Sequence, residues 1–241
     1  MTEALTERNR AAQELFAPIA ETYGRYARLL SFGQDGRWRS FLVARIAAAP
    51  SDTVLDVACG TGSVGLELVR SYGCNVVGVD QSAEMLAAGR SRVSSAGLDD
   101  RITLVEARAE ALPFPDASFD ALTFTYLLRY VDDVGATLRE LARVVRPGAR
   151  IAGLEFFLPP KPLARIPWEA YLRIGLPLAG RIASPGWHEV GRFLGPSIRD
   201  FYRRHPLGEQ LGLWREAGID DVRARKMSLG CGVVLWGTRG D

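Results

Sequence analysis

The chain has few cysteines, few histidines, no strong net charge and no long apolar run, and each shortage excludes a class of protein. Its cysteines, Cys59, Cys74 and Cys231, are too few and too scattered for a disulfide framework or a zinc site, so we expect buried thiols in a cytoplasmic protein. A net charge of +2 gives no reason to expect nucleic-acid binding. No stretch approaches the roughly 18 apolar residues of a membrane span. The first ten residues are polar and charged, unlike a signal peptide.

The 241 residues, 47% of them hydrophobic, can bury a substantial core as one domain. After a helical region, strands alternate with helices, which predicts a parallel sheet that binds its ligand at the carboxyl ends of the strands. We expect strands near 53–57, 75–79, 102–105, 119–125 and 149–155, and helices near 63–71, 83–96 and 134–145. Two later strands, near 222–225 and 233–236, should add an antiparallel edge. Within the domain we expect an N-terminal helical cap (1–50), a cofactor-binding core (51–155), a lid insertion (156–205) and a C-terminal helix and hairpin (206–241).

The most informative stretch is a buried strand that ends in a glycine turn, residues 54–62, followed by a second strand, residues 77–80, that ends in Asp80. Glycines let the backbone approach a ligand closely. A carboxylate at the tip of the second strand can accept hydrogen bonds from both ribose hydroxyls. Together these features predict a nucleoside site.

Two ligand classes fit this pattern. The run from Gly60 to Gly65 also matches G-x-G-x-x-G, and Asp80 follows Gly60 by twenty residues, which is an acceptable dinucleotide fingerprint. However, Asp56 would repel a pyrophosphate bound at the turn. S-adenosylmethionine has no phosphate, and its ammonium and sulfonium groups suit a carboxylate, so we favour it over NAD.

The chain resembles the ubiquinone/menaquinone biosynthesis C-methyltransferases, a family of class I S-adenosylmethionine-dependent methyltransferases. The motifs that carry the resemblance are Phe16-Ala17-Pro18-Ile19-Ala20, Tyr23, Ser31-Phe32-Gly33, Trp38-Arg39, Leu112-Pro113-Phe114-Pro115-Asp116, Ser118-Phe119-Asp120, Arg129, Arg146-Pro147-Gly148, Leu154-Glu155-Phe156 and Ser197-Ile198-Arg199. The resemblance covers nearly the whole chain. It implies a Rossmann-like, mostly parallel seven-stranded sheet with an antiparallel C-terminal edge, a helical cap and a helical lid. It also implies S-adenosylmethionine as cofactor, no metal, and a ring carbon of a polyprenylated quinol as methyl acceptor.

The resemblance also implies site residues. It places Thr61 in the glycine turn, Asp80 on the ribose and Thr125 beside the methionine moiety, with Arg108 and Ala109 near the adenine. Tyr23 would close over the cofactor. The full set expected to bind the cofactor is Tyr23, Asp56, Ala58, Gly60, Thr61, Gly62, Asp80, Gln81, Met85, Arg108, Ala109 and Thr125.

Several positions depart from the family pattern, mostly on the acceptor side. The family usually has Leu-Arg-Asn where this chain has residues 128–130, Tyr-x-Tyr-Leu where it has residues 191–194, and Gly-Gly where it has residues 230–231. Arg108 replaces an Asp or Asn that would accept a hydrogen bond from the adenine amino group. Arginine has no acceptor, so that bond must come from elsewhere or be absent.

Three residues are candidates for catalysis. Arg129 occupies the family's position at the reaction centre, where a guanidinium would hold a phenolate or enolate oxygen, since it is a poor base. Its alternative is a structural ion pair with Asp132, Asp133 or Glu155. His188 follows a Pro-Gly-Trp run in the lid and could act as a base, or be an ordinary loop histidine. Tyr130 could reach the acceptor or serve only in packing.

The lid is rich in proline, aromatic and basic residues, and residues 162–178 are amphipathic. This segment could lie peripherally on an anionic membrane, or be an ordinary lid helix with solvated arginines. We expect the lid and the cap to enclose an apolar pocket, with walls supplied by Phe16, Tyr23, Phe32, Trp168, Tyr171, Trp187 and Phe193. A homodimer is left open.

Three functions follow. The first is methylation of a quinol-like or other lipophilic aromatic, with demethylmenaquinol-type C-methylation in menaquinone biosynthesis as the leading case. The second is methylation of a specialised metabolite or a phospholipid amine. The third is a catalytically silent S-adenosylmethionine-binding subunit of a quinone-synthesis complex. The intact glycine turn and Asp80 favour turnover.

Overall fold

The computed structural model describes residues 7–241, so residues 1–6 of the expected cap and N-terminal stretch lie outside the described part. Seven strands form one sheet in the order β3-β2-β1-β4-β5-β7-β6. Their bounds are β1 (Thr53–Val57), β2 (Asn75–Asp80), β3 (Ile102–Glu106), β4 (Phe119–Thr125), β5 (Val145–Phe156), β6 (Ile219–Met227) and β7 (Gly232–Arg239). The first five strands are parallel, while β7 pairs antiparallel with both β5 and β6. The expected fold class is therefore confirmed.

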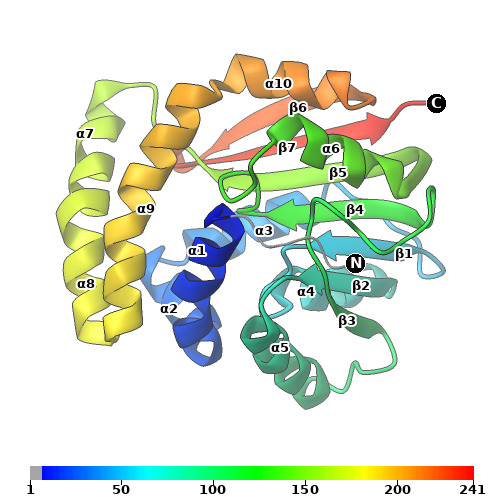
Figure 1. The fold of residues 1–241 in the computed structure, drawn as a ribbon, viewed down its shortest axis with the longest axis horizontal. Coiled ribbons are helices and arrows are strands. Elements are labelled where there is room, and N and C mark those ends of the chain that lie inside the picture. The colour runs from blue at the N-terminus through cyan, green and yellow to red at the C-terminus, as the bar shows by residue number, and fades with distance from the viewer. Residues whose placement is uncertain (1–6) are drawn as a thin grey trace.

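Helices surround the sheet and extend beyond one end of it (Figure 1). The N-terminal helices are α1 (Glu7–Phe16), a 3₁₀-helix (Ala17–Thr22), α2 (Tyr23–Leu30) and α3 (Gln34–Val43). The crossover helices are α4 (Ser63–Tyr72), α5 (Ala83–Ser95) and α6 (Val134–Arg143). The lid helices are α7 (Pro162–Ala170), a π-helical turn (Tyr171–Gly175), α8 (Leu176–Ala183) and α9 (Pro185–Arg204), and α10 (Leu207–Glu216) follows them.

The largest boundary difference from the sequence-based expectation concerns α6 and β5. The helix expected to run to 145 ends at Arg143, and the strand expected from 149 already begins at Val145, so Pro147-Gly148 lies inside β5. Val145 already pairs with Phe119, and the register then shifts before Ala121 meets Arg150. Pro147 is tolerated because it stands in this irregular stretch, where the ladder of hydrogen bonds is interrupted.

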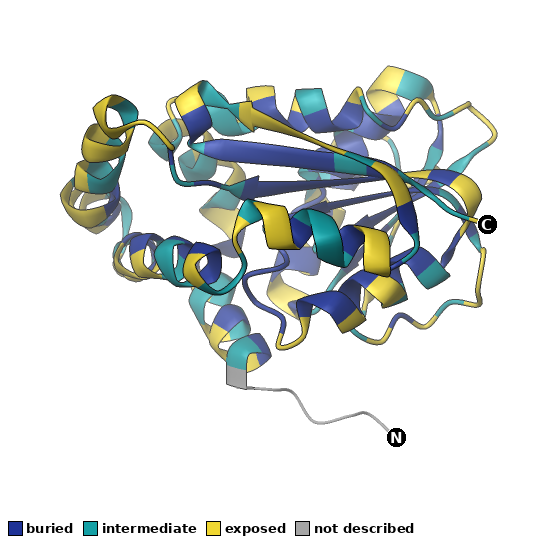
Figure 2. Ribbon diagram, turned by 90° about the horizontal axis from the view of Figure 1, so that it is seen from above, coloured by how far each residue is buried: buried dark blue, intermediate teal, exposed yellow. Residues whose placement is uncertain are grey.

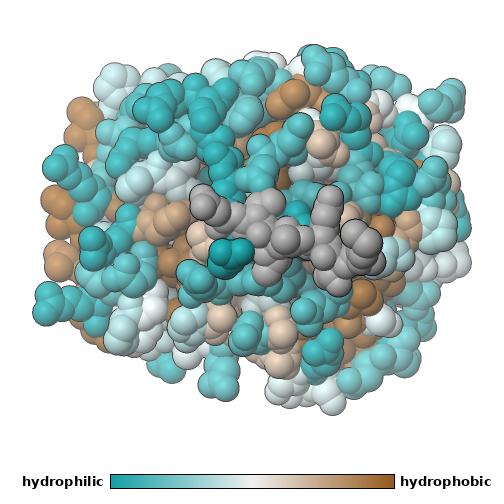
Figure 3. Space-filling view, in the orientation of Figure 1, coloured by the Kyte–Doolittle hydropathy of each residue, from teal (hydrophilic) through white to brown (hydrophobic). Residues whose placement is uncertain are grey.

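The outer faces of the helices are exposed and most strands are buried between them, whereas the edge strand β6 is largely exposed (Figure 2). Within residues 7–241, no helix combines the length and the hydrophobicity needed to cross a membrane. The face shown in Figure 3 is mostly hydrophilic, and apolar side chains gather at the edge where α7 and α8 lie.

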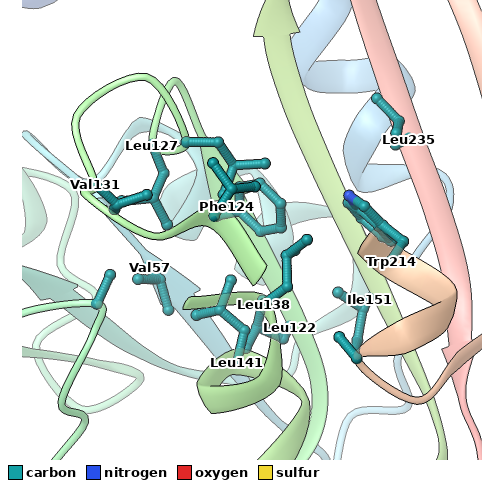
Figure 4. Packing of buried hydrophobic residues seen from close by; sticks show 14 of the residues in the cluster. Val57, Leu122, Phe124, Leu127, Val131, Leu138, Leu141, Ile151, Trp214 and Leu235 are labelled. Carbon is teal, nitrogen blue, oxygen red and sulfur yellow. The ribbon is translucent and has the colours of Figure 1, made fainter. Parts of the chain in front are cut away.

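Successive side chains of a strand point to opposite faces of the sheet, so the central strands contribute to two separate hydrophobic cores. Leu55, Leu122 and Ile151 belong to one cluster, which also contains Leu138 of α6 and Trp214 of α10 (Figure 4). The opposite cluster holds side chains of α3, α4 and α5. Because β1 and β4 are neighbours while β2 and β3 lie beyond β1, the strand order reverses between β1 and β4. A ligand site is expected at this reversal, outside the carboxyl ends of the strands.

Candidate functional site

Two adjoining cavities lie at the carboxyl ends of β1, β2 and β4. The first, the turn cavity, has a volume of about 110 Å³ and is lined by the glycine turn, the end of β2 and α1. The second, the lid cavity, has a volume of about 230 Å³ and lies between the N-terminal helices and the lid helices. The residues that line both are Phe16, Tyr23, Tyr126 and Tyr130.

The glycine turn is held against the end of β2 by Asp80. Gly60 and Gly62 have φ angles of 54° and 74°, which glycine adopts without a Cβ penalty. One carboxylate oxygen of Asp80 accepts from the N–H of Gly60 at 2.8 Å, and the other accepts from the N–H of Ser82 at 2.9 Å. Burial raises the pKa of Asp80, and these backbone donors act against that rise. Each oxygen keeps a lone pair for a further donor, as a ribose hydroxyl would supply.

Arg92, a side chain of α5, holds the glycine turn in place through hydrogen bonds. Arg92 donates to the carbonyl and hydroxyl oxygens of Thr61, at 3.0 and 2.6 Å, and to the hydroxyl of Ser63 at 3.0 Å. The N-terminus of α5 is capped by Ser82, whose hydroxyl accepts from the N–H of Met85. The Arg92 contact had no sequence signal, because nothing local indicates which helical arginine faces the turn.

Nine of the twelve residues expected to bind the cofactor line the turn cavity. They are Tyr23, Ala58, Gly60, Thr61, Asp80, Gln81, Met85, Ala109 and Thr125. Gly62 is outside the lining and forms the N-cap of α4. Arg108 is also outside it, and its guanidinium lies 3.8 Å from the carboxylate of Glu110, which does line the cavity. Glu110 was not singled out from the sequence, yet it places a hydrogen-bond acceptor near the position where Arg108 cannot supply one.

Asp56 lies behind the turn and not in the cavity wall. It shares the sheet face of Val54 and is 1% exposed, and one of its oxygens accepts from the Thr123 hydroxyl at 2.8 Å. The other oxygen has no hydrogen-bond partner within the described part of the chain. Burial raises the pKa of Asp56 to about 7, against the opposing effects of the Thr123 hydroxyl and of Arg39. The structure therefore does not bring this carboxylate into direct reach of a ligand in the cavity.

Arg39 lines the turn cavity, although its place in the Trp38-Arg39 motif did not indicate this position. It is 6% exposed, and its Nε donates to Asp35 at 2.9 Å. Its Nη1 lies 3.4 Å from the hydroxyl of Thr125, at the wall of the turn cavity. Thr125 is 86 residues away in sequence, so only the packing of α3 against β4 shows that this cation faces the site.

The lid cavity is walled by aromatic rings. Six of the seven expected aromatic residues line it, namely Phe16, Tyr23, Phe32, Trp168, Tyr171 and Trp187. Tyr23 stacks on Trp187 with centroids 6.0 Å apart, and Trp168 stacks on Tyr171 at the same distance. Phe193 does not line the cavity and stacks on Tyr130 instead. The wall is suited to a flat apolar ligand.

Arg129 both lines the lid cavity and forms a buried ion pair. Its Nε donates to Glu155 at 2.7 Å, and its Nη1 donates to Ser197 of α9 at 3.2 Å. Of the three carboxylates considered as partners from the sequence, it is Glu155 that forms the pair, since Asp133 caps α6 and Asp132 lies 3.7 Å from Arg8. Burial alone would lower the pKa of Arg129, but the Glu155 carboxylate raises it overall, so the guanidinium stays charged.

His188 lines neither cavity. Its Nδ1 lies 2.9 Å from the carbonyl oxygen of Pro177, so Nδ1 carries the proton and donates to that oxygen. The contact joins α9 to α8 inside the lid. His188, expected as a candidate for catalysis, therefore makes a contact within the lid. Tyr130, another candidate, lines both cavities.

Comparison with known proteins gives consistent matches. The profile of the ubiE/COQ5 methyltransferase family matches residues 2–239. The ubiquinone/menaquinone biosynthesis C-methyltransferase UbiE of Desulfotalea psychrophila is 34% identical over 98% of this chain and 94% of its own. The demethylmenaquinone methyltransferase of Lactiplantibacillus plantarum is 32% identical over 94% of this chain and 95% of its own. Among solved structures, Haemonchus contortus phosphoethanolamine N-methyltransferase 2 in complex with S-adenosyl-L-methionine shares the fold, with a TM-score of 0.63 and 15% identity over 85% of this chain and 53% of that one.

The position of Asp80 predicts its effect on ligand binding. Asp80→Ala removes a charged acceptor, whose hydrogen bonds contribute roughly 1.5–3 kcal/mol each. Titration calorimetry with S-adenosylhomocysteine should show affinity weakened at least tenfold. Glu106→Ala is the matched control, because Glu106 ends the neighbouring strand in register with Asp80 but is exposed and outside the cavity. Equal affinities for the two variants would show that the site is misplaced.

Asp56 predicts a pH dependence of stability. The folded protein keeps the Asp56 proton up to about pH 7, whereas an unfolded chain releases it near pH ~4. The folded state therefore binds more protons between these values, and the free energy of unfolding should fall as the pH rises through them, by on the order of 4 kcal/mol at most.

Asp56→Asn keeps the shape of the side chain without its ionisation, so this part of the pH dependence should vanish. Urea unfolding of both proteins at pH 5 and pH 8 measures the difference. The same loss of stability in both proteins would rule out Asp56 as its source.

Proposed function

Because the chain belongs to the ubiE/COQ5 methyltransferase family, and is therefore an S-adenosylmethionine-dependent methyltransferase, we propose that it methylates a ring carbon of a quinol-like or other lipophilic aromatic acceptor. The observation that carries this proposal is the lid cavity. It adjoins the turn cavity, its wall is mostly aromatic and aliphatic, and it offers a guanidinium at Arg129. The names of the relatives favour demethylmenaquinol-type C-methylation within this class.

The turn cavity fits S-adenosylmethionine. Asp80 would accept from the ribose hydroxyls, and Glu110 would accept from the adenine amino group in place of the residue that Arg108 has displaced. Arg39 would hold the carboxylate of the methionine moiety, since its guanidinium faces this cavity. Burial raises the pKa of Tyr23 to about 12, so its hydroxyl remains a donor where the two cavities meet.

The bound cofactor supplies a methyl group already activated by sulfonium, so the protein mainly aligns the acceptor and excludes water. Negative charge gathers on the acceptor oxygen as the ring carbon attacks. Arg129 would stabilise that charge in a site with little water, and Glu155 and Ser197 hold the guanidinium in place. Glu155 belongs to the core strand β5 and Ser197 to the lid helix α9, so the core and the lid both orient this cation.

The outer face of the lid supports a peripheral membrane contact. Leu163, Ile166, Ile174, Leu178 and Ile182 are between 57% and 91% exposed. Lys161 at the start of α7, Arg173 in the π-helical turn and Arg181 in α8 form no ion pair within residues 7–241. Apolar side chains flanked by cations fit the surface of an anionic bilayer. A lipophilic acceptor would then reach the cavity from the membrane.

Turnover of a short-chain demethylnaphthoquinol tests the acceptor. The wild-type protein should transfer a ¹³C-labelled methyl group to a ring carbon, as identified by NMR of the product, and should not methylate phosphoethanolamine. Methylation only of phosphoethanolamine would replace this function with the second alternative. Cofactor binding without turnover of either acceptor would favour the silent subunit.

Arg129→Ala should then lower kcat by on the order of a hundredfold, because a preorganised charge contact is lost, while cofactor affinity stays within a few-fold. This change leaves Glu155 buried without its partner, so Arg129→Lys serves as a second variant that keeps the charge but loses the planar guanidinium. It should retain more activity than Arg129→Ala. Full turnover by Arg129→Ala would remove this residue from the reaction.

Binding to vesicles tests the lid surface. Leu163→Asp combined with Ile182→Asp should reduce co-sedimentation with vesicles that contain anionic phosphatidylserine by tenfold or more. The matched control is Ala87→Asp with Ser94→Asp, which adds the same charge on exposed positions of α5, away from the lid (Figure 1). Sedimentation equal to wild type for the lid variant would refute the membrane contact. If the wild-type protein is a dimer and the lid variant is a monomer, the outer face of the lid binds a second copy of the chain instead.

A further inference from the structure

The lid cavity contains a carboxylate that the proposed mechanism has not used. Asp35, in the first turn of α3, supplies the only carboxylate among the residues that line this cavity in the described part of the chain. Its side chain is 14% exposed. The surrounding wall is otherwise mostly aromatic and aliphatic, so a hydroxyl that enters the cavity would find no other carboxylate among the described lining residues.

Three groups hold Asp35 in place. One carboxylate oxygen accepts from the hydroxyl of Tyr126 at 2.7 Å, and the other accepts from Nε of Arg39 at 2.9 Å. The N–H of Asp35 donates to the hydroxyl of Ser31. Each carboxylate oxygen retains a lone pair, and the carboxylate is oriented from two sides.

Tyr126 stands where the two cavities meet and is itself firmly positioned. It has a φ angle of 57°, unusual for a residue with a side chain, and its ring stacks on Phe156 with centroids 4.5 Å apart. Burial, and then the Asp35 carboxylate, raise the pKa of Tyr126, so its hydroxyl keeps its proton and continues to donate to Asp35. The strained backbone therefore places a donor on the carboxylate at the boundary between the two cavities.

We propose that Asp35 is the general base that removes the hydroxyl proton of the aromatic acceptor. This inference rests on the proposed function, because it requires a phenolic acceptor in the lid cavity. A phenol has a pKa of about 10 and attacks poorly while it keeps its proton, so a positioned base speeds the reaction near neutral pH. His188 faces α8 and does not line the cavity, which leaves this role to another residue.

The reaction transfers one proton to Asp35 and one methyl group to the ring. The acceptor O–H proton passes to the Asp35 carboxylate, and the ring carbon beside that oxygen forms a bond to the methyl carbon. The C–S bond breaks, and its electron pair stays on sulfur as a neutral thioether. The resulting ring ketone loses its ring proton to water, and Asp35 returns its proton to the oxygen, which restores the aromatic ring. Arg129 supplies the positive charge beside the anion in the lid cavity.

The competing explanation is that Asp35 only neutralises Arg39 and so orients that cation toward the cofactor. The two roles predict different losses. A general base contributes to kcat, and removing it no longer lowers kcat when the hydroxyl of the acceptor is already ionised. A residue that only orients Arg39 contributes to cofactor affinity, and its loss is unaffected by the ionisation of the acceptor.

The test compares Asp35→Asn with wild type on two acceptors, a short-chain demethylnaphthoquinol and a halogenated analogue whose hydroxyl is ionised at pH 7. On the first acceptor, kcat at pH 7 should fall by about a hundredfold or more, as is typical for loss of a general base. On the ionised acceptor the loss should shrink to a few-fold, and raising the pH should restore turnover of the first acceptor. Asp35→Glu keeps a carboxylate in the cavity and should recover part of kcat. Calorimetry with S-adenosylhomocysteine shows whether each variant is folded and binds cofactor.

Equal losses on both acceptors, or a loss confined to cofactor affinity, would overturn the assignment and leave Asp35 as the partner of Arg39. If wild type methylates the quinol and Asp35→Asn does so equally well, this inference fails while the proposed function stands. If wild type methylates no aromatic acceptor, the proposed function fails and the inference falls with it.

Discussion

The contact between the Asp80 carboxylate and the glycine turn determines where both cavities lie. It joins the end of β2 to the turn after β1, and the turn starts α4 at Gly62. A buried carboxylate is costly to desolvate unless it is hydrogen-bonded, and here two backbone N–H groups supply those bonds. The same oxygens face the turn cavity, so one group both supports the backbone and presents an acceptor to a ligand.

Contacts between the N-terminal helices and the lid then form the second cavity. The indole N–H of Trp187 in α9 donates to the hydroxyl of Thr22 at 3.0 Å, and the hydroxyl of Tyr171 donates to the carbonyl of Leu30. The lid is thereby attached to elements that also line the turn cavity. The packed lid therefore covers the lid cavity, which adjoins the turn cavity.

Charge within this apolar space is arranged in two ion pairs. Arg129 with Glu155 places a cation at the wall of the lid cavity, while Asp35 with Arg39 places an anion in that cavity and a cation in its neighbour. Buried charges that lose their partner destabilise a protein strongly, so each pair constrains the elements that carry it. The Arg129–Glu155 pair joins the loop after β4 to β5, whereas the Asp35–Arg39 pair lies within α3. It is the bonds from Arg39 to Thr125 and from Tyr126 to Asp35 that hold α3 at the end of β4.

The sequence by itself determined the sheet, the glycine turn and Asp80, because hydrophobic periodicity and glycine spacing are local properties that short stretches express without distant partners. It also indicated the aromatic character of the lid cavity, although Phe193 points elsewhere. Only the tertiary structure decided which charged side chains face the cavities. Arg39 reaches Thr125 across 86 residues, Asp35 meets Tyr126 across 91, and His188 turns to Pro177 because α8 and α9 pack closely. Asp56 could not be placed either. Alternation along β1 puts it on the face of Val54, but only the tertiary structure shows that helices bury this face and keep Asp56 out of the cavity wall. Long-range packing sets such directions, and no local pattern of residues encodes them.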